Sequence, residues 1–210
     1  MSVSQEFWDK KAGAYAESPI ADEESYQRKL SETQALLTPE MSILEFGCGT
    51  GTTAIKHAPN VKDILAIDIA QNMLEIGRER AKKAGVDNVV FKRSTLTGLC
   101  AKSESLDAVL GLNVMHLVPN RKETLADVAR ILKPGGIFVS STVCLGGSYL
   151  RFVKLFEPIG KFLGLMPDLF ILKESEWEKE IIDAGFTIET QWHHGNNGIA
   201  VFIIARKVTT

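Results

Sequence analysis

The sequence has few of the residues that cross-link or anchor a chain. It contains three cysteines, Cys48, Cys100 and Cys144, and no CxxC pair. The odd number and the spacing argue against a disulfide framework and suit a reducing cytoplasm. No uncharged run reaches the roughly 18 residues of a membrane-spanning helix, and the opening residues lack the apolar core of a secretory signal. We therefore expect a cytoplasmic chain without a transmembrane segment.

Charge of one sign is also lacking. The chain has 24 Lys and Arg against 26 Asp and Glu, a net charge of -2 at pH 7 and a pI of about 6.1. This balance does not indicate the strongly basic face of a nucleic-acid-binding protein. Hydrophobic residues make up 45% of the chain and charged residues 24%. These values are ordinary for a globular protein and disfavour a disordered or collagen-like chain.

Short apolar, β-branched runs alternate with helical patterns along most of the chain. Several runs are apolar almost throughout, as strands covered on both faces are. The alternation predicts an α/β fold: a Rossmann-like, seven-stranded, mostly parallel sheet with helices on both faces. Gly195–Gly198 is typical of a hairpin turn, so the last strand should be antiparallel. The predicted strands are Ser42–Phe46, Ile64–Asp68, Val89–Lys92, Ala108–Leu112, Ile137–Ser141, Thr187–Trp192 and Ala200–Ala205.

Polar caps and glycines predict where two of the helices begin and end. Each start is a capping box, in which the N-cap and N3 side chains satisfy the first backbone N–H groups. Each end has a glycine, which adopts the left-handed conformation easily. The starts are expected at Asn120 with Glu123 and at Ser175 with Glu178, and the ends at Lys133–Gly136 and at Gly185.

We expect residues 1–210 to form a single domain with four parts. These are an N-terminal helical lid (1–40), a ligand-binding core (41–141), an inserted cap (145–172), and a C-terminal helix with a β-hairpin (173–210). The cap segment is rich in large apolar residues but too charged to span a bilayer. A substrate cap is the favoured interpretation, while a dimer surface and a membrane-touching helix stay open. The residues expected to face a pocket are Tyr149, Phe152, Phe156, Phe162 and Met166.

The most informative segment is the glycine-rich turn in Leu44–Gly51, where a predicted strand meets a helix. Glycines adopt positive φ angles and let a ligand approach the backbone. In open α/β sheets ligands bind outside the carboxyl ends of the strands, where this turn lies. Its glycines are spaced GxGxG, not the GxGxxG of dinucleotide folds, which disfavours an NAD-dependent oxidoreductase. Two acids accompany it: Glu45 precedes it, and Asp68 ends the next strand, placed to bind ribose hydroxyls or to cap the next helix.

Three segments, Glu45–Gly51, Ile67–Asp68 and Leu132–Gly136, together resemble the class I S-adenosylmethionine-dependent methyltransferases. The resemblance is strongest to the quinone-biosynthesis-like group, also called methyltransferase type 11. It runs from about Leu44 to Gly136 and extends less specifically to the terminal hairpin and to Phe7–Lys11. The resemblance implies S-adenosylmethionine as the cofactor and methyl transfer as the activity. It does not identify the acceptor.

The resemblance also implies roles for individual residues. Glu45 would lie near the methionine ammonium group, the glycine turn would wrap the methionine moiety, and Asp68 would hold the ribose. The family commonly has Gly-Asp-Ala after the third strand, but this chain has Ser94-Thr95-Leu96, so Thr95 or a backbone carbonyl would accept from the adenine amino group. The implied cofactor-binding residues are Glu45, Gly47, Cys48, Gly49, Gly51, Asp68, Ile69, Met73, Thr95, Leu96, Leu112 and Asn113.

A general base is needed only if the acceptor arrives protonated, and histidine is suited to that task near neutral pH. His116 follows the fourth strand on the ligand side of the sheet and is our candidate; packing over the cofactor is the alternative. His57 is expected to lie away from the pocket, and packing is favoured for His193 and His194. No Cys, His and carboxylate cluster has ligand spacing, so no metal site is predicted.

The acceptor is expected to be a small, rather apolar molecule, bound beneath the lid and the cap. Trp8 and Tyr15 share one face of the first helix and are interpreted as part of the lid. Methylation of nucleic acid is disfavoured, because Asn113–His116 lacks the Asn/Asp-Pro-Pro-aromatic motif and because the pI is acidic. The alternatives are a nucleic-acid or protein methyltransferase and a non-catalytic S-adenosylmethionine-binding protein. No nucleic-acid partner is expected, and the sequence leaves the oligomeric state unknown.

Overall fold

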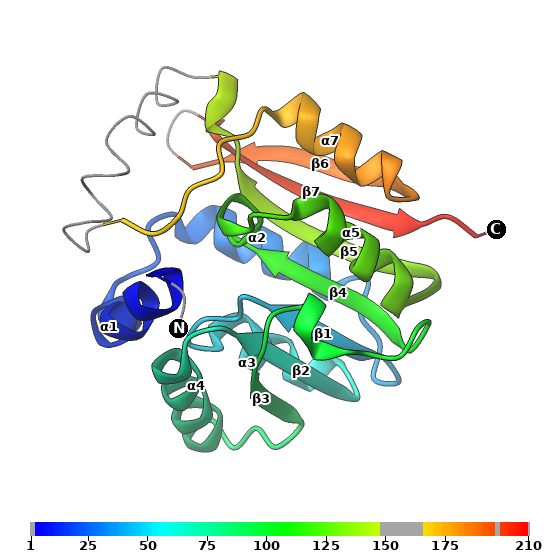
Figure 1. Ribbon diagram of the computed structural model, residues 1–210. Helices are drawn as coiled ribbons and strands as arrows, with labels where there is room; N and C mark the ends of the chain where they lie inside the picture. The colour runs from blue at the N-terminus through cyan, green and yellow to red at the C-terminus, as the bar shows by residue number, and fades with distance from the viewer. Residues whose placement is uncertain (1–2, 148–165, 196–197, 210) are drawn as a thin grey trace.

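A computed structural model describes residues 3–147, 166–195 and 198–209. The strands form one seven-stranded sheet in the order β3-β2-β1-β4-β5-β7-β6 (Figure 1). The first five strands in this order, β3, β2, β1, β4 and β5, pair in parallel. Strand β7 runs antiparallel to both β5 and β6. The strands are β1 (Ser42–Phe46), β2 (Asp63–Asp68), β3 (Val89–Arg93), β4 (Leu106–Leu112), β5 (Leu132–Val143), β6 (Phe186–His194) and β7 (Ala200–Lys207).

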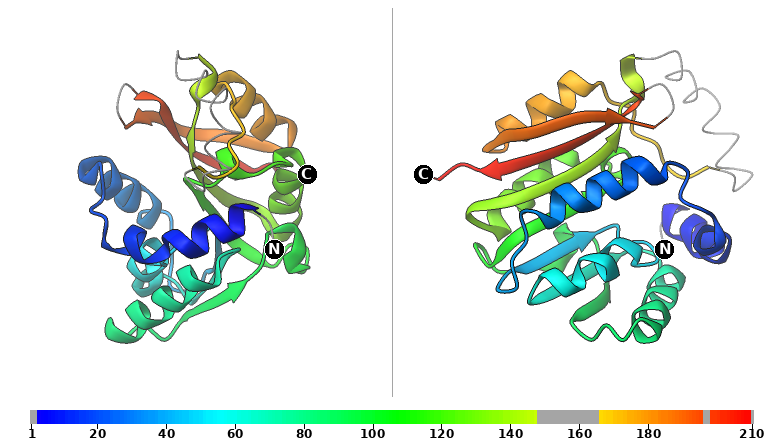
Figure 2. Two further views of the ribbon diagram at one scale, coloured as in Figure 1. Left: turned by 60° about the vertical axis from the view of Figure 1, so that its left-hand side comes forward. Right: turned by 180° about the vertical axis from the view of Figure 1, so that it is seen from behind.

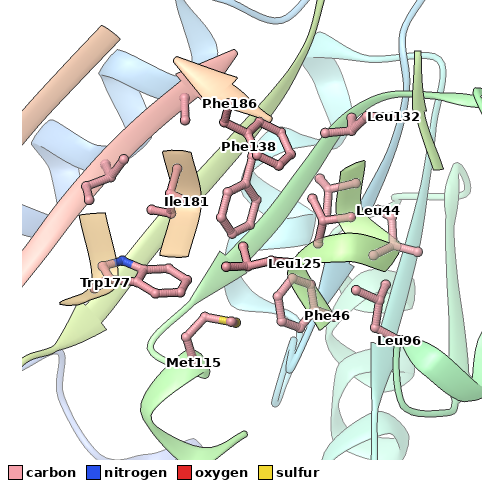
Figure 3. Close-up of a cluster of buried hydrophobic side chains, with 14 of the residues drawn as sticks. Leu44, Phe46, Leu96, Met115, Leu125, Leu132, Phe138, Trp177, Ile181 and Phe186 are labelled. Atoms are coloured by element: carbon pink, nitrogen blue, oxygen red, sulfur yellow. The ribbon is translucent and has the colours of Figure 1, made fainter. Parts of the chain in front are cut away.

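Helices cover both faces of the sheet (Figures 1 and 2). Helices α5 (Arg121–Ile131) and α7 (Glu174–Asp183) pack on one face, where Phe138 and Trp177 meet edge to face (Figure 3). Helices α3 (Thr52–His57) and α4 (Gln71–Lys83) pack on the other. Successive residues of β5 therefore point into different cores, and both are apolar. The predicted Rossmann-like fold with an antiparallel last strand is confirmed.

Two N-terminal helices reach the carboxyl edge of the sheet. Helix α1 (Val3–Glu17) lies against α4, where Asn72 N donates to Asp9 Oδ1 at 2.9 Å. Helix α2 (Glu23–Gln34) crosses the α3 side of the sheet (Figure 2). It is held there by Trp192 of β6, whose Nε1 donates to Glu32 Oε2 at 2.8 Å. Both helices thus lie where a ligand of an open α/β sheet binds.

Two of the predicted helix signals are wrong in detail. Asn120 is the N-cap of α5, but its side chain makes no capping hydrogen bond; Asn120 Nδ2 instead donates to Glu123 Oε2 at 3.3 Å. Helix α7 begins at Glu174, ahead of the predicted box, because Lys173 N donates to the Glu176 carboxylate at 3.0 Å. Glu176, an acid two residues earlier than the predicted Glu178, accepts from the free N–H and moves the N-cap from Ser175 to Lys173.

The two predicted helix ends agree with the structure. Helix α5 ends at Ile131, as expected before Lys133–Gly136, but those four residues are the opening of β5 and not a separate turn. They bulge between the Leu106–Leu132 and Ala108–Ile137 pairs. Gly185 has φ +90° beyond α7, which confirms its left-handed end.

Most of the predicted cap, residues 148–165, lies outside the described residues, and so do Tyr149, Phe152, Phe156 and Phe162. The end of the cap segment can be followed from Met166, which is half-buried. Phe170 N donates to His116 O at 2.8 Å, and Ser4 Oγ of α1 donates to Asp168 Oδ2 at 2.5 Å. Asp168 and Phe170, at the end of the cap segment, therefore lie beside α1 and His116. Within the described residues no helix is long and apolar enough to cross a membrane.

Candidate active site

The glycine turn after β1 has three residues with left-handed backbone angles. Gly47, Gly49 and Gly51 have φ values of +63°, +52° and +72°. A Cβ atom on Gly51 would lie 2.6 Å from the Phe91 ring, so both the backbone and the packing require glycine there. The helix that follows, α3, is only six residues long. The turn therefore presents backbone groups at the carboxyl edge of the sheet.

Asp68 links the glycine turn to the start of α4. Gly49 N donates to Asp68 Oδ2 at 2.8 Å, and Ala70 N donates to Asp68 Oδ1 at 2.9 Å. The N-cap of α4 is Ala70 and has no side-chain cap, so Asp68 does not cap that helix in the expected way. Each carboxylate oxygen keeps a lone pair for a further donor, as a ribose hydroxyl requires.

Glu45 is the least satisfied polar group of the turn. Its side chain is 3% exposed, and Oε2 has no hydrogen-bond partner among the described residues. Burial raises the pKa of Glu45 to about 8, and the nearby charge of Asp68 adds to the effect. A buried carboxyl group without a cation is destabilised in its charged form. An ammonium group placed beside it would reverse that effect, and the donor set therefore fits an amino acid ligand.

Arg80 of α4 holds the turn and α1 together, and the sequence analysis missed it. Its Nη1 donates to Thr50 Oγ1 at 2.7 Å and to Thr52 Oγ1 at 3.0 Å. Its Nη2 donates to the carbonyl oxygen of Ala16 at 2.5 Å. An arginine on the polar face of an amphipathic helix is expected to be exposed to solvent, so the sequence does not indicate this role.

The two aromatic residues of the predicted lid share one face of α1. The Trp8 and Tyr15 rings meet edge to face, with centroids 6.1 Å apart. Tyr15 lies over the turn, since a Cβ atom on Gly49 would be 3.7 Å from its ring. Trp8 packs against a small apolar cluster that contains Met73. Helix α1 thus covers the turn, and its role as a lid stays a prediction.

The residues expected near adenine lie in unlike surroundings. Ile69 is half-buried, while Met73 is 2% exposed beneath α1. The side chain of Leu96 packs in the main core next to Phe46 (Figure 3), so that only its backbone can reach a ligand. Thr95 is exposed, but its hydroxyl already accepts from Gly98 N at 3.0 Å. Adenine contacts in this region remain predictions.

At the end of β4, Asn113 takes a left-handed φ of +54°. Ser141 Oγ, at the neighbouring position on β5, donates to Asn113 Oδ1 at 3.0 Å. The same Ser141 Oγ lies 2.9 Å from His194 Nε2 on β6. Because serine has a single hydrogen to donate, the His194 ring donates to it. This chain of contacts fixes the Asn113 carbonyl and leaves its NH2 group for a ligand.

A small cavity of about 40 Å³ lies between α2, α3 and the end of β4. His57 lines it and is 1% exposed, so the expectation that His57 lies away from the pocket is wrong. The helix after the glycine turn is short, and its last residue therefore stays close to the sheet edge. The residues that line the cavity are Tyr26, Lys29, Leu30, Thr53, His57, Leu112 and Asn113.

His116 lies in a short 3-10 turn after β4 and does not line that cavity. Burial lowers its pKa to about 4, and its Nδ1 has no partner among the described residues. The ring is therefore neutral near pH 7 but a weak base. Nothing described here places it against an acceptor, so its role as a base stays a prediction. Phe170 N donates to the carbonyl oxygen of His116, so the described end of the cap segment lies beside this residue.

Cys48 behaves as a packing residue of the turn. It is buried, and burial together with the charges of Glu45 and Asp68 raises its thiol pKa well above the usual value. A protonated thiol is a poor nucleophile. In the described part of the chain no cluster of three or more His, Cys, Asp or Glu could hold a metal ion.

A larger hollow of about 410 Å³ lies over the start of α5, on the face of the sheet that α5 and α7 cover. It is lined by charged and polar side chains, and its Arg121 binds Glu180 through two hydrogen bonds of 2.9 and 3.0 Å. This paired charge ties α5 to α7. We therefore regard this hollow as a surface feature, and the glycine turn with the end of β4 as the site.

Residues 43–136 match the family model described as a methyltransferase domain. The chain is 38% identical over 98 residues to a demethylmenaquinone methyltransferase of Clavibacter sepedonicus, covering 46% of this chain and 39% of that protein. It is 31% identical over 112 residues to a ubiquinone biosynthesis O-methyltransferase of Roseobacter denitrificans, covering 51% and 45%. The chain thus spans less than half the length of these relatives.

The crystal structure of the YcgJ protein from Bacillus subtilis shares the fold, with a TM-score of 0.73 and 18% identity over 88% of this chain and 100% of that one. The matched family segment contains the glycine turn, Glu45, Asp68 and Asn113. Solved structures that share the fold include a SAM-dependent methyltransferase from Methanosarcina mazei and a geranyl diphosphate C-methyltransferase from Streptomyces coelicolor in complex with S-adenosyl-L-homocysteine. Sequence segment and fold agree: residues 43–136 match a methyltransferase domain, and the described residues have the fold of the YcgJ structure.

Proposed function

We propose that the protein transfers a methyl group from S-adenosylmethionine to a small, rather apolar acceptor. The observation that carries the proposal is the buried Glu45 carboxyl group, whose Oε2 has no hydrogen-bond partner among the described residues, beside a turn of left-handed glycines. An amino acid ammonium would satisfy that carboxyl group, and the glycine backbone can approach the rest of the ligand closely. The names of the two relatives given above refer to ubiquinone biosynthesis and to demethylmenaquinone, and this supports a small acceptor.

The cofactor supplies a methyl group on a positively charged sulfur, and the residues of this chain would hold and align the reactants. Glu45 would pair with the ammonium group, and Asp68 would accept from the ribose while keeping the turn in place through Gly49. Leu112 and Asn113 would border the methyl group at the end of β4. Alignment of acceptor and donor is the main contribution expected of such a site. Helix α1 would exclude water from it.

Binding of S-adenosylhomocysteine, the demethylated cofactor, tests the first half of the proposal. Calorimetric titration should give a dissociation constant on the order of micromolar, with a matching rise in melting temperature, and NAD should give neither. Turnover with a methyl-labelled donor against small phenols, quinols and carboxylic acids then tests the second half. Binding of NAD in place of S-adenosylhomocysteine would contradict the proposal. Binding of the cofactor without turnover of any acceptor would favour a non-catalytic protein.

A further inference from the structure

The cavity between α2, α3 and β4 is large enough for a small polar group. Its volume is about 40 Å³, whereas one buried water needs roughly 10–15 Å³ by such a measure. A group of about three heavy atoms, the size of a carboxylate, would therefore fit. Leu30 and Leu112 also line the cavity. The rest of a ligand would have to extend out of it toward the carboxyl edge of the sheet.

Among the described residues that line this cavity, Lys29 carries the positive charge. The residue is 9% exposed, and no ion pair joins it to any acid in the described residues. Burial lowers the pKa of Lys29, and the charge of Asp22 opposes this in part. Asp22 is itself engaged, since it accepts from Ser25 N at 3.1 Å and from Gly195 N at 3.2 Å. A buried ammonium without a counter-ion is costly unless a ligand supplies one.

The other polar groups around the cavity are suited to donating hydrogen bonds. His57 is 1% exposed, and neither of its ring nitrogens has a partner within the described residues. The Tyr26 and Thr53 hydroxyls lie side by side. Asn113 turns its NH2 group away from Ser141, because its carbonyl oxygen accepts from Ser141 Oγ. None of the seven described lining residues is an acid. The cavity thus offers donors and one positive charge.

We propose that this cavity binds a negatively charged oxygen of the methyl acceptor, a carboxylate or an ionised hydroxyl, with Lys29 as its counter-ion. The inference rests on the proposed methyl transfer and narrows its substrate to an apolar molecule that carries one acidic oxygen group. Lys29 and His57 contact that oxygen. His194 and Ser141 act indirectly, as positioning residues, through Asn113.

A pair of probes of equal shape tests the charge. 4-Hexylbenzoate and 4-hexylbenzamide are titrated into the protein saturated with S-adenosylhomocysteine, and also into the free protein. The benzoate should bind at least about tenfold more tightly than the amide, as a charge-assisted hydrogen bond predicts. 4-Hexyl-2,6-difluorophenol, whose hydroxyl ionises near neutral pH where Lys29 is still charged, is titrated above and below its own pKa and shows whether an ionised hydroxyl is bound as well. Equal affinity for the benzoate and the amide would overturn the proposal.

Two lysine variants locate the effect. Lys29→Met should remove the preference for the benzoate while leaving S-adenosylhomocysteine binding unchanged, and Lys29→Arg should retain part of it. Lys56→Met, at an exposed position on α3, is the matched control and should change neither. The free Lys29→Met protein should melt a few degrees higher than the wild type, because an unpaired buried charge is removed. A benzoate preference that survives in Lys29→Met, or a lower melting temperature of that variant, would assign Lys29 a structural role instead.

The design separates this inference from the proposed function. If S-adenosylhomocysteine does not bind to the wild type, the methyltransferase proposal fails, yet the benzoate and amide titrations of the free protein still measure the anion site. If S-adenosylhomocysteine binds and the two probes do not differ, the anion site fails and the methyltransferase proposal stands.

Discussion

The glycine turn after β1 and the cavity at the end of β4 lie at the same edge of one sheet, but they bury groups of opposite charge. The turn is bordered by two acids, Glu45 at 3% exposure and Asp68 at 9%. The cavity is bordered by Lys29 and by the neutral His57, with no acid among its described lining residues. An acidic half suits a cationic amino acid ligand and a basic half suits an anionic oxygen. The contrast therefore assigns the two halves of the site to two different reactants.

The largest effect that would test this contrast is the pH dependence of stability at Glu45. Native Glu45 keeps its proton up to pH about 8, whereas an unfolded glutamic acid releases it near its ordinary pKa of 4.5. The native state thus binds more protons in this window, so stability falls as the pH rises from about 5 to 8. The loss should be on the order of 3 kcal/mol, since one pKa unit is worth about 1.4 kcal/mol. Glu45→Gln should flatten the curve.

Denaturant unfolding of both proteins at several pH values measures this difference. Asp68 contributes in the same direction, because burial raises its pKa too, so a small slope should remain in Glu45→Gln. Saturation with S-adenosylhomocysteine should also reduce the fall of the free energy of unfolding with pH in the wild type, because the ammonium group of the ligand stabilises the ionised form of Glu45. Parallel curves for wild type and variant would show that Glu45 is already charged and that the acidic half is misassigned.

The second effect concerns the backbone of the turn. Gly51→Ala places a methyl group 2.6 Å from the Phe91 ring at a φ of +72°. The strain and the overpacking together should lower the free energy of unfolding by about 2–4 kcal/mol. Gly85→Ala is the matched control, because Gly85 has a φ of +68° and nothing within 4 Å of the added atom. The control should lose only about 1 kcal/mol. If both variants lose the same free energy of unfolding, the Phe91 ring moves to accommodate the methyl group, and packing against Phe91 does not stabilise the turn.

The third effect tests Asp68 as a ligand of the cofactor. Asp68→Asn should weaken S-adenosylhomocysteine binding by about 1.5–3 kcal/mol in calorimetry, the range for a hydrogen bond to a charged group. Some stability is lost as well, since the amide cannot accept from both Gly49 N and Ala70 N. Asp63→Asn, at the other end of β2, should leave binding unchanged. If Asp68→Asn binds S-adenosylhomocysteine as tightly as the wild type, Asp68 only stabilises the turn and does not contact the cofactor.

The two halves also differ in how far the sequence predicts them. The acidic half is a contiguous motif: the glycines require special backbone angles, and strand ends place Glu45 and Asp68 beside them. Sequence patterns therefore located it, together with the seven strands and the antiparallel last strand. The basic half is assembled from α2, α3, β4, β5 and β6, which meet only when the sheet is built. Lys29, Ser141 and His194 are far apart in the chain, and no spacing links them.

The errors have the same origin. His57 follows the turn by six residues and was expected to point elsewhere, but α3 is too short to carry it away from the edge. Arg80 carries no signal because its partners, Thr50, Thr52 and Ala16, come from other elements. The contact of the His194 ring with Ser141 likewise has no signal in the sequence, because the two residues lie on different strands. Local patterns predict local structure, whereas these roles depend on contacts between distant segments.

The smallest effect is expected from Ser141→Ala, which cuts the link between His194 and Asn113. Loss of one buried hydroxyl should lower stability by about 1 kcal/mol, and S-adenosylhomocysteine affinity should stay within error of the wild type. Binding of 4-hexylbenzoate should weaken several-fold, because the Asn113 amide is free to turn its carbonyl oxygen toward the anion. Ser140→Ala is the control, since that buried hydroxyl contacts Thr142 and not Asn113. If Ser140→Ala and Ser141→Ala weaken benzoate binding alike, the orientation of Asn113 does not matter, and the basic half reduces to Lys29 and His57.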